Sequence, residues 1–269
     1  MEPHPFDDAV ALTRQADGRY AGTVPPPYWN MVGPFGGTTA AVLLRAALAE
    51  QPAGIEPVAF TVNYCAALAR GDFTIDARTV HAGRSVRHVN VEMQQGNGTV
   101  STASAVLALR RPTWAHQPAK PPAVPPPEAV SAMPTDGAPN WLQRYDFRFV
   151  HGAWQWQAQP YDTLRSAHST LWVADKPPRA LDFLSLTALA DVFFVRAFHV
   201  RGTTVPAGTV SMTVHYHASA EELAAHGDAP VLCTVDAHTF ARNFGDQIAQ
   251  LWSGDKLLAT TTQMTWFKQ

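Results

Sequence analysis

The residue best suited to chemistry is an aspartate set in an apolar stretch. Asp191 lies in the run Leu184–Val195, whose other members are mostly apolar. Burying a carboxylate is costly unless it is hydrogen-bonded or paired, and a carboxylate held by nearby donors is suited to act on a ligand or a water molecule. We therefore expect Asp191 to be at least partly buried and functional. The competing interpretation is an aspartate on a helix surface or in a buried cap.

Two uncharged donors in later segments could hold this carboxylate. Thr209 opens a strand-like segment that leads to His215, and Gln263 lies close behind three threonines near the C-terminal end. A hydroxyl and a carboxamide can both donate to a carboxylate without neutralising its charge. Taken alone, Gln263 is more typical of a solvated strand face, so its interpretation depends on its neighbours in space.

Four further residues could contact a substrate. Gly36 and Gly37 allow a ligand to approach the backbone closely, although an ordinary turn would also explain them. Arg84 and Arg242 could meet phosphate groups, although isolated arginines are also typical of a solvated surface.

Several other chemistries are disfavoured. His215 and His217 alternate along one segment, but two histidines without a third ligand do not predict a metal site. The chain has no Gly-x-Ser-x-Gly motif and no glycine pattern of a Rossmann fold or P-loop. We therefore expect neither a metal nor a cofactor.

Composition limits the class of protein further. The chain has 269 residues, a net charge of −2 and 46% hydrophobic residues, which is enough for a large core. Its arginines are scattered, so no nucleic-acid partner is expected. No apolar run approaches the roughly 20 residues that span a bilayer. The N-terminal segment lacks the features of a secretory signal, and we expect a cytoplasmic protein.

The elements that must position these residues follow from hydrophobic periodicity. The pattern predicts a helix at Thr38–Glu50, rich in alanine and leucine. Alternating apolar residues predict strands around it, at Arg19–Val24, 58–64, 73–77, 89–93 and 100–109. The second half repeats this order. It has a long apolar stretch of helical character at Ala180–Ala197 and strands near 145–149, 170–173, 207–218, 230–238, 246–252 and 257–267.

Two local similarities indicate that the halves are duplicated. The segment Thr61–Ala66 resembles Thr213–Ala218 at an offset of 152, and the segment at 97–103 resembles that at 254–261 at an offset of 158. The predicted fold class is therefore α+β, with two fused halves that each wrap a curved antiparallel sheet around one long helix. Sheets of this type leave edges that can pair between subunits, so a homo-oligomer is expected.

A proline-rich segment divides these halves. Residues 112–139 hold nine of the 22 prolines, which disfavour helix interiors and central strands. We expect an extended linker there, between an N-terminal half at 1–111 and a C-terminal half at 140–269 that carries the active site.

Four segments carry a family resemblance. They are Phe35–Gly37, Arg179–Phe194, Gly208–His217 and Leu258–Gln263. In this order they resemble the bacterial acyl-CoA thioesterase II family, whose members are double hotdog proteins. The resemblance covers nearly the whole chain, and it is sharpest around Asp191 and Gln263.

The resemblance implies hydrolysis of an acyl-CoA thioester to free acid and CoA. Asp191, Thr209 and Gln263 would then orient and activate a water molecule, with Asp191 as general base. Backbone amides at a helix N-terminus, with Gly36 and Gly37 as candidates, would stabilise the oxyanion. Arg84 and Arg242 would be candidates for contacts with the phosphates of CoA.

Two other functions stay open at this point. A hotdog enoyl-CoA hydratase or dehydratase would need a histidine paired with the acid, and His199 follows only after the predicted helix. A non-catalytic acyl-CoA-binding protein would need no water-activating set. The repeat offsets place Ala105 and Pro57 opposite Gln263 and Thr209, which favours one polar site per chain over generic core packing.

Overall fold

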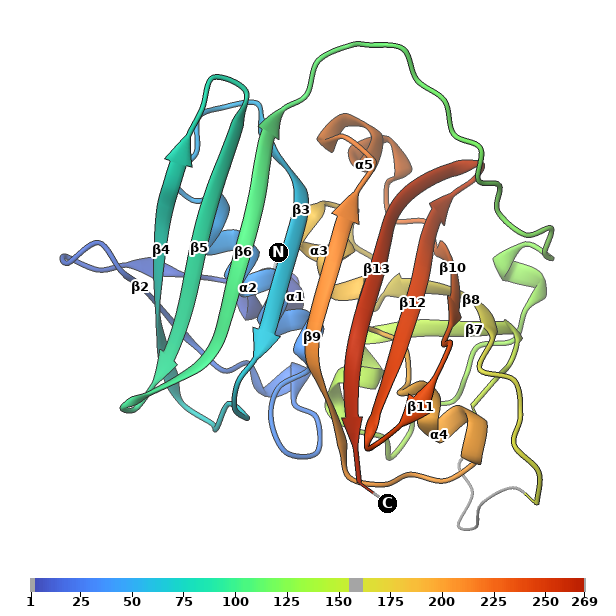
Figure 1. Ribbon diagram of the computed structural model, residues 1–269. Coiled ribbons are helices and arrows are strands. Elements are labelled where there is room, and N and C mark those ends of the chain that lie inside the picture. The colour runs from blue at the N-terminus through green and yellow to red at the C-terminus, as the bar shows by residue number, and fades with distance from the viewer. Residues whose placement is uncertain (1–2, 155–161, 269) are drawn as a thin grey trace.

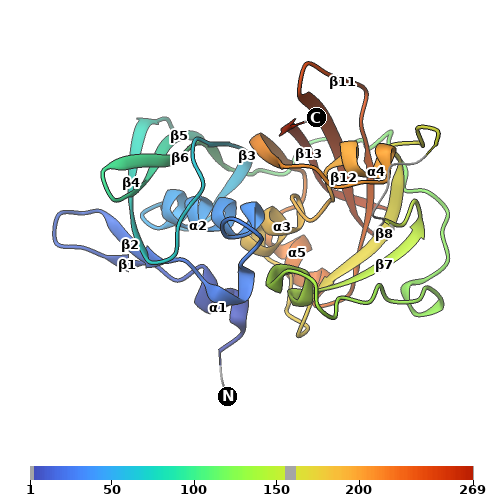
Figure 2. The ribbon, with the colours of Figure 1, turned by 90° about the horizontal axis from the view of Figure 1, so that it is seen from below.

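One antiparallel sheet organises the whole chain. The computed structural model describes residues 3–154 and 162–268. In this part of the chain a 13-stranded sheet runs in the order β1-β2-β4-β5-β6-β3-β9-β13-β12-β10-β8-β7, with β11 paired to β12. Figures 1 and 2 show the sheet curving around α2 and α3, which lie on its concave side. The fold is therefore α+β, as predicted.

The elements of the first half surround one helix of 13 residues, α2. In chain order they are α1 (Pro5–Ala9), β1 (Thr13–Arg14), β2 (Tyr20–Thr23), α2 (Gly36–Leu48), β3 (Ile55–Tyr64), β4 (Asp72–Ala82), β5 (Val86–Gln95) and β6 (Gly98–Leu109). Short 3-10 helices lie at Pro26–Tyr28, Pro127–Ala129 and Asn140–Arg144.

The second half repeats the pattern with shorter helices. Its elements are β7 (Tyr145–His151), β8 (Ser169–Asp175), α3 (Phe183–Leu189), α4 (Arg196–Arg201), β9 (Ala207–Tyr216), α5 (Ala220–His226), β10 (Val231–Asp236), β11 (Phe240–Ala241), β12 (Phe244–Ser253) and β13 (Lys256–Phe267). The main predicted strands are thus confirmed.

The single helix predicted at Ala180–Ala197 is wrong. α3 begins with a capping box between Asp182 and Ser185 and ends at Leu189. The residues that follow, 191–195, are an aspartate, two valines and two phenylalanines, all of modest helix propensity. The side chain of Asp191 is also held by other segments, as described below. The chain therefore turns at Asp191, and α4 starts afresh five residues later.

The two halves meet at an approximate twofold axis. β3 and β9 pair antiparallel with Thr61 opposite Thr213, and the hydroxyl oxygens of these two threonines are 2.9 Å apart. They are also the residues that the repeat offset of 152 matches. Figure 1 shows β3 and β9 side by side at the centre of the sheet.

Details of the strand ends repeat across this axis. The amides of Cys65 and Ala66 both donate to the carbonyl of Val100, and the amides of His217 and Ala218 both donate to the carbonyl of Leu258. Each inner strand also has a register shift against its outer neighbour, between Pro57 and Ala59 in β3 and opposite Met264 and Thr265 in β9. The similarity that the sequence predicts therefore extends to hydrogen bonds and bulges.

The proline-rich segment lies against the second half. In Figure 1 it leaves the upper end of β6 and arches over the top of the sheet to its right-hand edge. Gln117 donates to the carbonyl of Asp255, and the Trp172 indole donates to the carbonyl of Pro125. Ala119 and Val124 pack on a small cluster of Leu232, Trp252 and Leu257. The boundaries at 111 and 140 stay a prediction.

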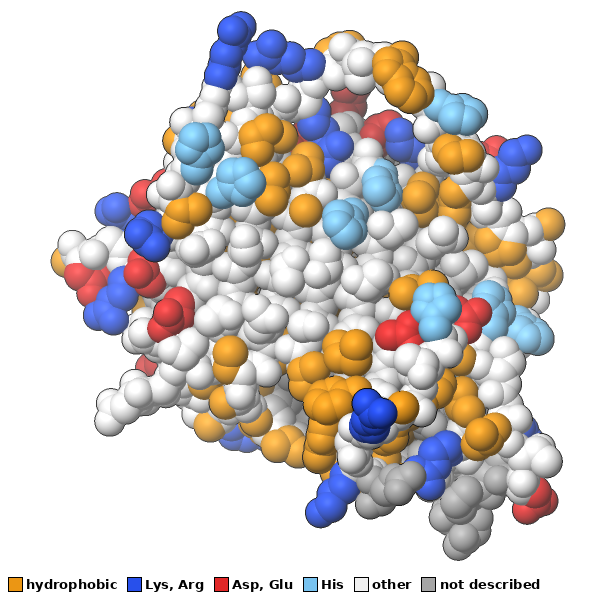
Figure 3. Space-filling view, viewed as in Figure 1, with side chains coloured by type: hydrophobic (Ala, Val, Ile, Leu, Met, Phe, Trp, Pro, Cys, Tyr) orange, Lys and Arg blue, Asp and Glu red, His pale blue; other side chains and the backbone are white. Residues whose placement is uncertain are grey.

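The convex face of the sheet is mostly neutral. Figure 3 shows a broad area of uncharged polar side chains and backbone over the central strands, with apolar side chains gathered below it. The exposed apolar residues of β12 and β13 are Phe244, Met264 and Trp266. No helix of the described residues is long and apolar enough to cross a membrane.

Candidate active site

Asp191 lies where the end of α3 meets the start of α2. Its amide donates to the carbonyl of Ala188 at 3.1 Å, and the residue is 8% exposed. A Cβ atom added to Gly36 would lie 2.7 Å from Asp191 Oδ2, so the carboxylate rests directly on this glycine. The amide of Gly37 also stabilises the carboxylate. The negative side chain thus lies at the N-terminal, positive end of the α2 dipole.

Gln263 completes the contact from the sheet. Gln263 lies in β13 and is 5% exposed. Its Nε2 donates to Asp191 Oδ1 at 3.0 Å and to the carbonyl of Ala190 at 3.1 Å. A third neighbour is the sulfur of Met212, 3.6 Å from the same nitrogen. The structure therefore brings together Asp191, Gln263, Gly36 and Gly37, all four of which the sequence singles out.

The surroundings set the charge of the carboxylate. Burial raises the pKa of Asp191 from 3.8 to about 7, while the bonds from Gln263 and Gly37 act in the opposite direction. A base whose pKa lies close to neutral pH can be ionised yet still accept a proton readily. This environment suits proton transfer better than a permanent negative charge.

Thr209 lies close by in the fold but outside this hydrogen-bonded set. It is half-buried in β9 and is the Cα partner of Thr265, whose side chain is buried on the concave face of β13. Cross-strand partners project to the same face, so Thr209 faces the helices, as Gln263 does. In the described chain no hydrogen bond joins Thr209 to Asp191 or to Gln263. Of the three residues expected to act together, Asp191 and Gln263 are therefore hydrogen-bonded to each other. Thr209 lies farther along the same face of the sheet.

Tyr64 is a member of the site that the sequence does not reveal. This residue at the end of β3 donates from its hydroxyl to the carbonyl of Gly36 at 2.9 Å. Burial and the nearby charge of Asp191 raise the pKa of its phenol well above the usual value. Tyr64 therefore stays protonated and fixes the first residue of α2. The sequence shows it only as one member of an alternating strand.

In the part of the chain that the structure describes, the equivalent position in the other half lacks this carboxylate–carboxamide pair. Gln263 pairs with Met212 in the sheet, and its repeat equivalent Ala105 pairs with Phe60. Tyr216, the equivalent of Tyr64, exchanges a hydrogen bond with Thr187 at 2.6 Å instead. The described chain therefore has one buried carboxylate–carboxamide pair at this type of position.

Comparison with protein families identifies the fold family. Residues 25–108 match the acyl-CoA thioesterase N-terminal domain, and residues 118–267 match the acyl-CoA thioesterase C-terminal domain. The chain belongs to the acyl-CoA thioesterase family. The predicted enzyme class, a thioester hydrolase, is confirmed at this level.

Solved structures agree with the fold. A hot dog fold protein of unknown function from Alicyclobacillus acidocaldarius is 38% identical, with a TM-score of 0.93 and coverage of 100% of this chain and 99% of that chain. An acyl-CoA thioesterase II from Mycobacterium marinum is 15% identical, with a TM-score of 0.77 and coverage of 98% of both chains. The second likeness supports the double hotdog fold alone. No curated protein matches the chain.

The two arginines lie away from the carboxylate of this thioesterase. Arg84 is exposed in the turn between β4 and β5, which lies at the Ile55 end of β3. Tyr64 lies nine residues away at the other end of that strand, about 30 Å along it. Arg242 is exposed in the turn before β12 with a φ of 52°. It is five residues, or about 17 Å, from the strand position paired with Gln263. The structure thus does not bring Arg84 to the carboxylate.

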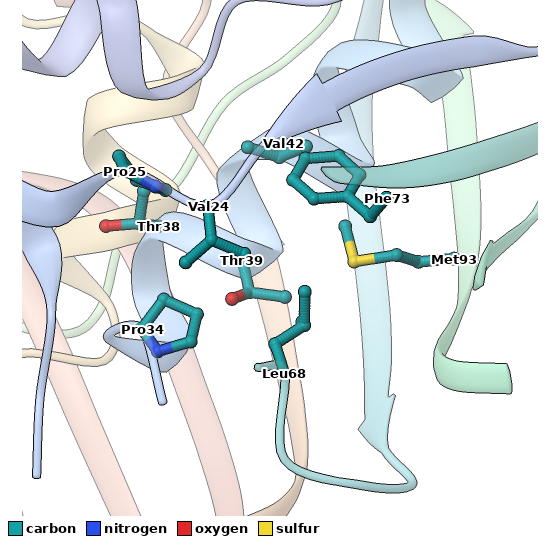
Figure 4. Close-up of a pocket in the computed structure, with 9 residues that line it drawn as sticks. All are labelled: Val24, Pro25, Pro34, Thr38, Thr39, Val42, Leu68, Phe73 and Met93. Atoms are coloured by element: carbon teal, nitrogen blue, oxygen red, sulfur yellow. The ribbon is translucent and has the colours of Figure 1, made fainter. Parts of the chain in front are cut away.

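A small apolar cavity lies beside the first turn of α2. Figure 4 shows Thr39, Val42, Leu68 and Met93 among the side chains around it. Its interior measures about 10 Å³, which is about the space that one water molecule needs. An acyl chain could enter here only if these side chains moved apart.

Two histidines lie at the C-terminal end of β9, His215 within the strand and His217 just after it. His215 and His217 are exposed, and the His217 ring contacts the hydroxyl of Thr260 at 3.2 Å. Within residues 3–154 and 162–268, no group of three or more His, Cys, Asp or Glu residues could hold a metal ion.

Proposed function

We propose that this chain hydrolyses an acyl-CoA thioester to a free acid and CoA, with water activated by Asp191. The observation that carries the proposal is the buried carboxylate at the N-terminus of α2, hydrogen-bonded by Gln263 at 3.0 Å. Burial of a carboxylate costs stability. Core packing alone therefore does not explain an acid at this position. Membership of the acyl-CoA thioesterase family supports the substrate class.

The reaction needs one proton acceptor and one oxyanion site. Ionised Asp191 takes a proton from water as the water oxygen attacks the thioester carbonyl carbon. The tetrahedral intermediate then expels the CoA thiolate, which takes the proton from Asp191. Gln263 and the Gly37 amide hold the carboxylate in place through both steps. The amide of Gly36 is the donor that we assign to the oxyanion, since first-turn amides lack partners within the helix.

Thr209 has a separate role in this scheme. Its side chain faces the same side of the sheet as Gln263 but makes no hydrogen bond to the pair in the described chain. We assign its hydroxyl to the attacking water or to the thioester, which would enter between Thr209 and Asp191. Arg242 remains the candidate for a phosphate of CoA. Homo-oligomerisation and cytoplasmic residence stay predictions.

Release of free thiol from acyl-CoA is the direct test. A panel of short, medium, long and aromatic acyl-CoAs should give thiol release with at least one member, measured with a thiol reagent. Hydration of an enoyl-CoA without thiol release would favour a hydratase. That reaction is disfavoured because His199, in α4, is buried and has no hydrogen bond to Asp191 in the described chain. Tight binding without turnover across the panel would favour a binding protein.

The rate should depend on pH through Asp191. A general base acts in its ionised form, and the pKa of this carboxyl is raised to about 7. We therefore expect kcat/KM to fall about tenfold per pH unit well below pH 7 and to level off above it. Thiol-release rates between pH 5 and 9 measure this profile. A plateau that extends down to pH 5 would contradict the assignment of Asp191 as the base.

A further inference from the structure

The carboxamide of Gln263 has one donor end and one acceptor end. Its Nε2 lies 3.0 Å from Asp191 Oδ1 and 3.1 Å from the carbonyl of Ala190. A reversed amide would place Oε1 against both acceptors and would remove the bond that favours ionised Asp191. The group that holds Oε1 therefore also affects the charge of the carboxylate.

That group is a second glutamine on the neighbouring strand. Gln247 in β12 is the Cα partner of Gln263 and is 2% exposed. Its Nε2 donates to Gln263 Oε1 at 3.2 Å, while its own Oε1 is buried without a partner in the described chain. Burial of a carboxamide whose acceptor oxygen has no hydrogen bond costs stability. A role for the donor end of Gln247 therefore explains its burial better than packing alone does.

We propose that Gln247 is a positioning residue, which fixes the carboxamide of Gln263 so that its N–H groups face Asp191. The proposal rests on the proposed function of Asp191 as general base. Reversal of the Gln263 amide would set two donors against each other at Gln247 and two acceptors against each other at Asp191. A hydrogen bond received at Oε1 also polarises the amide and strengthens its N–H donors.

Gln247→Met removes the donor while keeping a long, unbranched side chain. We expect kcat to fall about tenfold with KM unchanged, because Gln263 then holds Asp191 less well. The acid limb of the pH profile should also move to higher pH, since the Gln263 bond acts to lower the pKa of Asp191. Gln250→Met is the matched control. Gln250 is a half-buried glutamine three residues along the same strand, at a position that alternation places on the other face.

Gln247→Glu gives a second, more specific readout. The introduced carboxyl group would still donate to Gln263 Oε1 while protonated, but its ionised form would repel that oxygen. Burial would raise the pKa of this new carboxyl above its usual value. We therefore expect a new loss of activity on the alkaline side and a bell-shaped profile. A role in shape alone predicts no such alkaline loss, since glutamate and glutamine have nearly the same size and the added negative charge by itself would only move the acid limb to higher pH.

Each outcome separates this inference from the proposed function. Thermal unfolding of every variant shows whether it is folded. If folded Gln247→Met keeps the wild-type kcat and pH profile and folded Gln247→Glu shows no alkaline loss while Asp191→Asn is inactive, the positioning role of Gln247 is wrong and the base stands. If Asp191→Asn is as active as wild type, the proposed function itself fails.

Discussion

Asp191→Asn should lower kcat by about three orders of magnitude, within the range that general bases contribute. Asparagine has nearly the same shape, and its one acceptor oxygen can still receive the hydrogen bond from Gln263. It cannot accept a proton from water, however. The expected result is therefore a folded protein that binds acyl-CoA with little turnover, measured by thiol release and by thermal unfolding.

The same substitution should not destabilise the protein at pH 8. The pKa of Asp191 is raised in the folded state to about 7 from its ordinary value of 3.8. The folded state therefore binds more protons than the unfolded state between these values, and wild-type stability falls as pH rises from about 4 to about 7. Asparagine has no such penalty, so the Tm of the variant at pH 8 should equal or exceed that of wild type.

Asp175→Asn is the matched control for this prediction. Asp175 is a second buried carboxylate, 7% exposed, whose pKa burial also raises to about 7. It ends β8 opposite Tyr145 and has no hydrogen bond to Asp191 in the described chain. Its replacement should leave thiol release close to wild type. A large loss of thiol release in both variants would mean that replacing either buried acid impairs the enzyme. The assignment of Asp191 as the base would then be contradicted.

Local pattern was sufficient for much of this fold and for the carboxylate, the carboxamide and the two glycines of the candidate site. Strand periodicity predicts most of the strands, because one face of each is buried and the other is not. Asp191 stands out because it is the one charged residue in the apolar run Leu184–Val195. Comparison of the two halves singles out Gln263, because its repeat equivalent, Ala105, is apolar.

Other features depend on contacts that spacing does not encode. Tyr64 resembles any strand tyrosine until α2 is placed at the end of β3. Gln247 and Gln250 lie three residues apart in one strand, and only the register with β13 shows which one faces Gln263. The break after α3 has the same cause: Asp191 is bound by segments from both halves, and these contacts override the helical character of 180–197.

Gly36→Ala should reduce kcat about 100-fold while the fold survives. A Cβ atom at this position would lie 2.7 Å from Asp191 Oδ2 and 3.4 Å from the hydroxyl of Tyr64. The carboxylate belongs to a side chain and can move, so the clash is relieved by displacing the carboxylate that we propose as the base. A displacement of about 1 Å in a catalytic group can cost this much rate. Thiol release and thermal unfolding measure the two effects separately.

Gly37→Ala is the informative comparison, because its clash cannot be relieved in the same way. The added Cβ would lie 2.5 Å from the backbone carbonyl of Ala188 and 2.6 Å from the ring of Phe35. Relief would require α2 and α3 to move apart, and we expect a marked loss of Tm. A Gly36→Ala variant with the wild-type rate would mean that the carboxylate need not rest on the first turn of α2.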